Sequence, residues 1–382
     1  MKRLCILTLA LVCAAATSCI YDFEAEVEGQ SGILVVEGDI LAGDISVIDL
    51  TLSQTLSDKS DAVRVQAQVW VEQQDGTRFS GYRSGERYYV DTRSLDPSQQ
   101  CRLCVNNTSY GTCRSQWLDI LRSPQIGEIT NSVTEDGEYM NIYVSTGSSG
   151  EGSGYYRWMV SEEWEYVSDY YATHYYDPAS GKVLPFEGDD NTHFCWNSGS
   201  VSSLMVGSTA KLKQDKLENQ YLYNIHNDNI KISYIYAVTV EQRAISEDAY
   251  SYWVTVIQND DGVGGLFSPQ PSEMRGNITC DSNPDKPVLG YISASTVTSK
   301  RAFFRNKDTG FYKKPKTGEI IEPEEIPEAD WNAVYLLDNM RVYTFYETET
   351  QVYEDRFTWL PRRCVDCTAM GGTTEKPEDW PL

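Results

Sequence analysis

Cysteine is the residue type whose number and spacing suggest the most chemistry in this chain. Seven cysteines follow residue 19: Cys101, Cys104, Cys113, Cys195, Cys280, Cys364 and Cys367. The pairs 101/104 and 364/367 have the spacing of zinc ligands, and together they would supply four thiolates. These pairs are far apart in the sequence, and disulfides are the usual fate of such residues in an oxidising compartment. We therefore expect disulfides and no metal, with at least one thiol left over because seven is odd.

One disulfide is suggested by the local sequence. Cys104 and Cys113 flank a turn-like stretch at residues 106–111, so we predict a bridge between neighbouring strands. The connectivity of the other cysteines stays open, because spacing alone does not determine it.

Residues that do acid, base or nucleophilic chemistry form no recognisable pattern. The three histidines, His174, His193 and His226, lack the spacing of a metal site or a catalytic triad. The sequence has no G-x-S-x-G elbow and no phosphate-binding glycine loop. The acidic stretches 187–191 and 259–262 lack EF-hand spacing, so we interpret them as solvated turns. We expect no catalytic residues and no cofactor.

A dense aromatic zone between residues 155 and 176 is the better candidate for binding. Exposed Tyr and Trp side chains make contact surfaces for sugars, peptides or proteins. Alternating aromatic residues are also what a half-buried sheet prefers, and that interpretation suits most of the zone. We place the candidate ligand or partner surface at the last four tyrosines, whose pairs point to both faces: Tyr170, Tyr171, Tyr175 and Tyr176.

The composition sets the class of protein that must position these residues. The chain has 382 residues, of which 41% are hydrophobic and 12% aromatic, and its formal net charge is −24. This length suggests two domains. The negative charge argues against nucleic acid as a partner, since a phosphate backbone needs clustered Lys and Arg.

The first segment predicts the location. A positive start is followed by an apolar run from Leu4 to Ala16, which is too short to span a bilayer. We interpret residues 1–18 as a signal peptide. Ala16-Thr17-Ser18-Cys19 resembles a bacterial lipobox, so we predict that Cys19 carries diacylglyceryl and acyl chains, with residues 19–31 as a tether.

The rest of the chain has the hydrophobic pattern of a mainly β protein. Period-two alternation, as at residues 63–71, predicts an antiparallel sandwich over residues 32–123, Ig-like or transthyretin-like. Asp75-Gly76 predicts a hairpin turn within it, because an Asp-Gly pair tolerates positive φ. Ser123-Pro124 marks the boundary, since Pro cannot donate within a ladder. A second β-rich domain follows over residues 124–382, with strands predicted at 230–243 and 334–337. It contains one short amphipathic helix near 247–258, capped by Ser246.

Several segments resemble the Bacteroidetes lipoprotein family known as domain of unknown function 4249. The matching stretches are Leu34–Ile40, Ser246–Trp253, Leu266–Pro271, Arg275–Ile278, Val288–Tyr291 and the end of the chain from Cys364 to Trp380. We interpret these motifs structurally. Gly276 and Gly290 suit tight backbone geometry, Cys364 and Cys367 are predicted to form a tight bridge, and Trp380 to fix the tail.

The resemblance implies an outer-membrane lipoprotein with no established catalytic residues. It implies a non-enzymatic binding or accessory component of a TonB-dependent nutrient transporter, with a small-molecule, glycan or peptide ligand that the sequence does not identify. A fimbria-like adhesive or structural subunit is the alternative, and a hydrolase that uses paired carboxylates ranks last.

Overall fold

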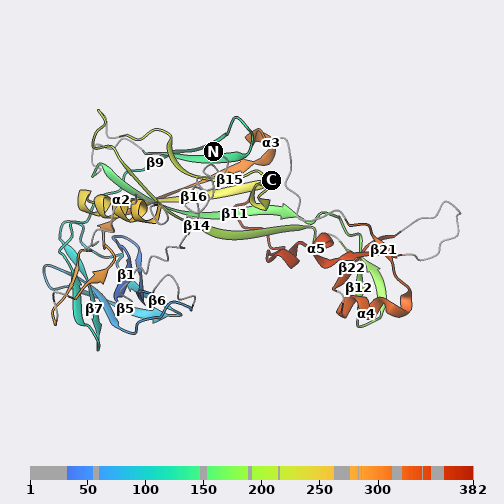
Figure 1. Ribbon diagram of the computed structural model, residues 1–382, viewed down its shortest axis with the longest axis horizontal. Helices are drawn as coiled ribbons and strands as arrows, with labels where there is room; N and C mark the ends of the chain where they lie inside the picture. The colour runs from blue at the N-terminus through green and yellow to red at the C-terminus, as the bar shows by residue number, and fades with distance from the viewer. Residues whose placement is uncertain are drawn as a thin grey trace, which may run out of the picture.

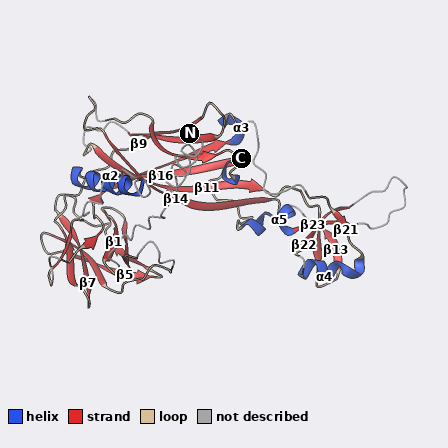
Figure 2. Ribbon diagram, viewed as in Figure 1, coloured by secondary structure: helices blue, strands red, loops and turns tan. Residues whose placement is uncertain are grey.

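The computed structural model describes residues 32–54, 60–146, 153–187, 192–213, 216–261, 276–282, 284, 286–311, 321–337, 339–345 and 357–381. Figure 1 shows three parts: an N-terminal sandwich that lies beneath one end of a central pair of sheets, and a small lobe at the other end of the long axis. We call this last part the distal lobe. The protein is mainly β, as predicted, and its helices are short (Figure 2). No helix in the described part of the chain is long and apolar enough to cross a membrane, and Cys19 lies outside the described residues.

The N-terminal sandwich is one strongly curled sheet of nine strands, in the order β17-β8-β7-β4-β5-β6-β3-β1-β18. Its inner face encloses a largely aliphatic core that includes Leu34, Ile48 and Leu50. The turn at Asp75-Gly76 joins β4 and β5 as the sequence predicts, with Gly76 at φ +88°. The strands are β1 Leu34–Gly38, β3 Ile45–Leu52, β4 Gln68–Gln73, β5 Arg78–Ser84, β6 Arg87–Asp91, β7 Cys101–Asn107, β8 Gly111–Ser115, β17 Ile278–Cys280 and β18 Val288–Leu289, with β2 Ile40–Leu41 and β19 Ala294–Ser295 pairing beside them.

The sandwich is not complete at residue 123. β17, β18 and β19 return from residues 278–295 to pair with β8, β1 and β2, so the predicted domain 32–123 lacked three of its strands. Gly276 and Gly290 lie where this returning chain passes closest to its neighbours. A Cβ at Gly290 would lie 1.9 Å from the Val36 carbonyl oxygen, and one at Gly276 would lie 1.8 Å from that of Gly290. The tight backbone geometry predicted for these glycines is confirmed.

The central part consists of two sheets with a shared core, three strands in one (β15-β10-β9) and four in the other (β14-β11-β16-β20). Ile230–Ile232 is the 3-10 turn η1 capped by Asn229, so the predicted strand at 230–243 starts later, at Ile235. The strands are β9 Ile126–Val133, β10 Tyr139–Thr146, β11 Tyr155–Val167, β14 Phe194–Ser208, β15 Gln220–His226, β16 Ile235–Ala244 and β20 Val297–Arg305, followed by the short helix α3 Asn306–Thr309.

The predicted amphipathic helix is α2, Glu247–Asp261. Ser246 caps it, since its Oγ accepts a hydrogen bond from the Ala249 amide at 3.1 Å. The helix runs through residues 259–261, which were predicted to be a turn. Its Tyr252 hydroxyl accepts a hydrogen bond from the Gly290 amide at 3.2 Å. The helix therefore packs against the sandwich as well as the central sheets (Figure 1).

The distal lobe is built from two distant parts of the chain, the connection between β11 and β14 and the residues after 320. Its β12–β13 hairpin packs beside the three-stranded sheet β21-β23-β22. Residues 331–336 form a helix, so the strand predicted at 334–337 is wrong. The elements are β12 His174–Asp177, β13 Lys182–Pro185, β21 Glu324–Glu325, η2 Glu328–Asp330, α4 Trp331–Leu336, β22 Met340–Phe345, β23 Phe357–Pro361, α5 Arg362–Val365 and η3 Cys367–Met370.

The disulfides differ from both predicted pairings. Cys113 pairs with Cys280, and Cys195 pairs with Cys367. Cys104 and Cys364 are free and buried, as is Cys101. Cys104 fails to reach Cys113 because the two lie on opposite faces of the sheet: Cys104 pairs in register with Arg114, and Cys113 points into the core. Cys113 instead faces Cys280 in the returning strand β17.

Candidate functional site

Several contacts join the base of the distal lobe to the central sheets. β11 and β14 pair as far as Val167 and Phe194, and the Cys195–Cys367 disulfide joins β14 to the chain that returns from the lobe. The Tyr166 hydroxyl donates to the Cys367 carbonyl at 2.9 Å, and the Cys367 amide donates to the Thr192 carbonyl at 2.9 Å. These contacts fix the base of the lobe on the central sheets.

The four candidate tyrosines all belong to this lobe, but they do not form one surface. Tyr171 and Tyr175 are exposed, at 50% and 39% of their surface. Tyr170 is half-buried, donating to the Ile321 carbonyl at 3.1 Å and packing edge-on against Tyr343. Tyr176 is buried, so its assignment to a binding surface is wrong. Successive side chains of β12 point to opposite faces of the strand, so Tyr176 points inward where Tyr175 points outward. The adjacent tyrosines in the sequence predicted this two-sided arrangement.

Tyr176 instead belongs to an aromatic core. It lies 6.2 Å from Trp331 and 5.8 Å from Trp359, measured between ring centroids. Trp359 is fully buried, and Val342 fills the space beside these rings. In a lobe this small, large flat side chains bury much surface per residue. This core therefore holds in place the β12–β13 hairpin and α4, which line the neighbouring groove.

The groove has a volume of about 650 Å³ and lies between the β12–β13 hairpin and the segment from β21 to α4. That volume is within the usual range for ligand sites, roughly 300–1,000 Å³. The hairpin supplies one wall and the opposite segment the other, with aromatic rings between them. The lining residues are His174, Gly181, Lys182, Val183, Pro185, Glu325, Ile326, Pro327, Glu328, Trp331 and Phe357.

A smaller cavity of about 190 Å³ shares His174 with the groove. Arg341 and Asp366 line it. Burial lowers the pKa of Arg341, whose guanidinium stacks 4.1 Å from the centre of the Tyr335 ring. Burial opposes ionisation of Asp366, but hydrogen bonds from Thr368 and Arg362 outweigh it and lower the pKa of that carboxyl. Both charges are satisfied within the protein, so this cavity is part of the lobe's own structure.

The groove does not look like the site of a carboxylate-based hydrolase. Glu325 and Glu328 both line it, but both side chains are exposed. A general acid in such enzymes needs an apolar surrounding to keep its proton at neutral pH. Within the described residues, no group of three or more His, Cys, Asp or Glu side chains is placed to hold a metal ion.

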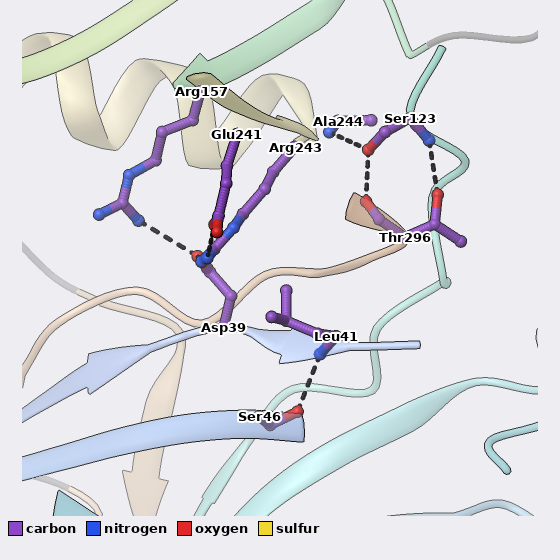
Figure 3. Close-up of polar contacts among 9 residues, drawn as sticks. All are labelled: Asp39, Leu41, Ser46, Ser123, Arg157, Glu241, Arg243, Ala244 and Thr296. Carbon is purple, nitrogen blue, oxygen red and sulfur yellow. Dashed lines mark hydrogen bonds and ion pairs between the residues drawn. The ribbon is translucent and has the colours of Figure 1, made fainter. Parts of the chain in front are cut away.

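A buried ionic cluster joins the sandwich to the central sheets, and no sequence pattern predicted it (Figure 3). Asp39 follows β1, is 3% exposed, and accepts a hydrogen bond from Arg243 Nη1 at 2.6 Å. Glu241 binds Arg243 Nη2 at 3.0 Å, and Arg157 lies 3.5 Å from Asp39. Burial disfavours the charged guanidinium, but the two carboxylates outweigh this and raise the pKa of Arg243.

The predicted boundary at Ser123-Pro124 lies beside this cluster. The Ser123 amide donates to Thr296 Oγ1 at 2.9 Å, and its Oγ accepts from the Ala244 amide at 2.8 Å (Figure 3). The chain therefore crosses between the two parts through a buried, hydrogen-bonded junction, not a loose linker. This junction fixes the orientation of the sandwich relative to the central sheets. β11 and β14 continue from those sheets to the distal lobe.

Comparison with known protein families places the chain in one of them. A family model described as domain of unknown function (DUF4249) matches residues 20–301. The chain belongs to this family. The matched residues include the sandwich and most of the central sheets, and they end before the second half of the distal lobe.

Known structures and curated proteins add little. A two-domain fibronectin type-III segment of chicken tenascin is similar over 57% of this chain and 92% of its own, with 8% identity and a TM-score of 0.16. A cytokine receptor complex is similar over 72% of this chain and 98% of its own, with 8% identity and a TM-score of 0.21. Neither likeness bears on function. No curated protein matches the chain.

Proposed function

We propose that this protein is a lipid-anchored binding protein of the outer membrane, which presents its distal lobe to a partner and works with a TonB-dependent nutrient transporter. The observation that carries the proposal is the lobe itself. It stands at the end of the molecule farthest from the N-terminal sandwich (Figure 1), and it has exposed tyrosines beside a groove.

The order of parts along the chain suits a tether. An acylated Cys19 would be joined to the sandwich by residues 20–31, whose fully extended length is about 40 Å. The sandwich would then lie nearest the membrane and the lobe far from it. A tether also raises the local concentration of the binding surface near a transporter in the same membrane.

Binding is favoured over catalysis by what surrounds the polar groups. The ionic groups of the junction pair with one another, and those of the smaller cavity are paired within the lobe, which suits a rigid scaffold. The groove combines aromatic rings with exposed charges, an arrangement typical of contact surfaces. The proposed protein needs no cofactor apart from the lipid on Cys19.

The test is recovery of a TonB-dependent receptor from cross-linked, solubilised outer membranes. The test variant is Tyr171→Ser with Tyr175→Ser, which removes two exposed rings from the described part of the lobe. The control variant is Tyr82→Ser with Tyr221→Ser, at rings exposed by 58% and 47% elsewhere. We expect the wild type and the control to recover the receptor and the lobe variant to lose most of it.

Equal recovery by both variants, or no receptor with the wild type, would overturn the proposal. A Cys19→Ala variant separates the anchor from the lobe. It is expected to leave the membrane fraction and to lack the lipid mass on the N-terminal peptide, with the lobe unchanged.

A further inference from the structure

The charges around the groove indicate what kind of ligand it takes. Glu325 and Glu328 line one wall, and Lys182 is the one formal cation among the lining residues that the structure describes. Further exposed carboxylates lie on the same segment, at Glu322, Glu324 and Asp330. The mouth of the groove is therefore negative, which favours a cationic ligand and disfavours an anionic one.

Histidine does not offset this negative charge. His174 lies in the wall of the groove, and burial lowers its pKa. The ring is therefore neutral at pH 7 and adds no positive charge beside the carboxylates. Lys182 remains as the opposing cation, on the hairpin wall.

The aromatic rings in the groove suit a cation as well. Phe357 lies 5.5 Å from His174 and 5.8 Å from Trp331, measured between ring centroids. A guanidinium or ammonium over the face of such rings is attracted by their negative π surface. The protein uses this contact elsewhere in the same lobe, where Arg341 lies 4.1 Å from the centre of the Tyr335 ring.

We infer that the groove of the distal lobe binds a basic peptide segment of a protein partner, with an Arg or Lys side chain between Glu325, Glu328 and the half-buried ring of Phe357. Arg suits it better than Lys, since a planar guanidinium stacks on rings and binds carboxylates through two hydrogen bonds. A peptide is favoured over a small cation because carboxylates continue along the segment outside the groove. This inference rests on the proposed binding role of the lobe and specifies its partner.

The probe is a fluorescein-labelled peptide of eight residues containing three Arg separated by Gly and Ser, measured by fluorescence anisotropy. Peptides with Lys or Glu in place of Arg are compared at equal salt. Because the whole protein is acidic, the test needs a variant that removes charge elsewhere. Glu135→Gln with Glu138→Gln removes two exposed carboxylates near the β9–β10 turn and is matched in charge to Glu325→Gln with Glu328→Gln.

We expect the groove variant to weaken binding of the Arg peptide about tenfold, and the matched control to change it less than about twofold. Lys182→Glu is expected to strengthen binding, an effect that loss of folding does not produce. Affinity should fall in the order Arg, Lys, Glu. Equal weakening by the two double variants, or equal binding of the Arg and Glu peptides, would overturn the inference.

Failure of this inference differs from failure of the proposed function. If the Glu325→Gln, Glu328→Gln protein still recovers its receptor while the Tyr171, Tyr175 variant does not, the lobe binds a partner but the groove does not select a basic segment. If neither variant affects recovery, the lobe is not the binding region.

Discussion

The N-terminal sandwich and the distal lobe are built in different ways. They share one feature: each includes segments from a later part of the chain, and a disulfide holds a later segment in place beside each of them. The sandwich has one continuous core made mostly of Val, Leu and Ile, within a sheet that curls until its end strands meet. The lobe has two small clusters, one of them mostly aromatic. A few large rings replace the many aliphatic side chains that a small lobe has no room for.

The two regions also differ in the charge of the residues that line their concave surfaces. The groove of the lobe is lined by carboxylates and aromatic rings. A concave region of the sandwich, of about 710 Å³, is lined by Arg78, Arg83 and amide side chains, with no carboxylate among the described residues that line it. Arg78 already stacks 4.7 Å from the centre of the Trp70 ring. The described residues that line the two concave surfaces therefore differ in charge, with two carboxylates and one lysine in the lobe and two arginines in the sandwich.

The largest effect expected from this difference is local unfolding of the lobe. Trp359→Ala removes a fully buried ring from a core of few residues and should cost about 3–5 kcal/mol. Leu50→Ala in the sandwich, at 1% exposure, should cost about 2–5 kcal/mol. Hydrogen exchange with mass spectrometry should show faster exchange in β12, β22 and β23 for the first variant and in β1 and β3 for the second. Faster exchange of the sandwich in the Trp359 variant would show that the two regions fold as one unit.

A smaller effect is expected at the junction between the sandwich and the central sheets. Asp39→Asn leaves buried Arg243 with Glu241 as its charged partner and should cost about 3 kcal/mol, the low end for breaking a buried ion pair. The matched control is Asp91→Asn, since Asp91 and its partner Arg93 are exposed, and it should cost much less than Asp39→Asn because solvent screens a surface ion pair. Urea denaturation gives both values. Equal costs would show that the junction is as weakly coupled as a surface pair.

The sequence predicted the elements whose contacts are local. The turn at Asp75-Gly76 and the helix beginning after Ser246 were placed correctly because their signals are short: a residue with positive φ and a capping hydroxyl. Trp380 was also predicted correctly as a tail anchor, since it is buried against Phe303 and donates to Glu165 at 2.7 Å.

The predictions that were wrong concern features that depend on contacts between distant parts of the chain. The pattern at residues 334–337 suits a strand or a helix, and packing of Trp331 at the start of α4 decides for the helix. Cys113 and Cys280 are separated by 167 residues, so no local spacing could pair them. The same applies to the ion pair of Asp39 with Arg243. The candidate tyrosines lie in the lobe that contains the groove, but residues within 325–331 also line that groove, and nothing in the sequence linked them to the tyrosines.

The smallest expected effect is a pH dependence confined to the lobe. Burial lowers the pKa of His174 below its ordinary value of 6.5, so the unfolded lobe binds a proton more readily than the folded lobe does. Stability from this group is present above about pH 6.5 and is lost as pH falls toward the folded pKa. The sandwich contains no histidine. Exchange in β12 and β13, corrected for the intrinsic rate, should therefore quicken between pH 7.5 and 5 more than in β1 and β3. His174→Gln should remove the difference, and a difference that persists would place its origin in another group of the lobe.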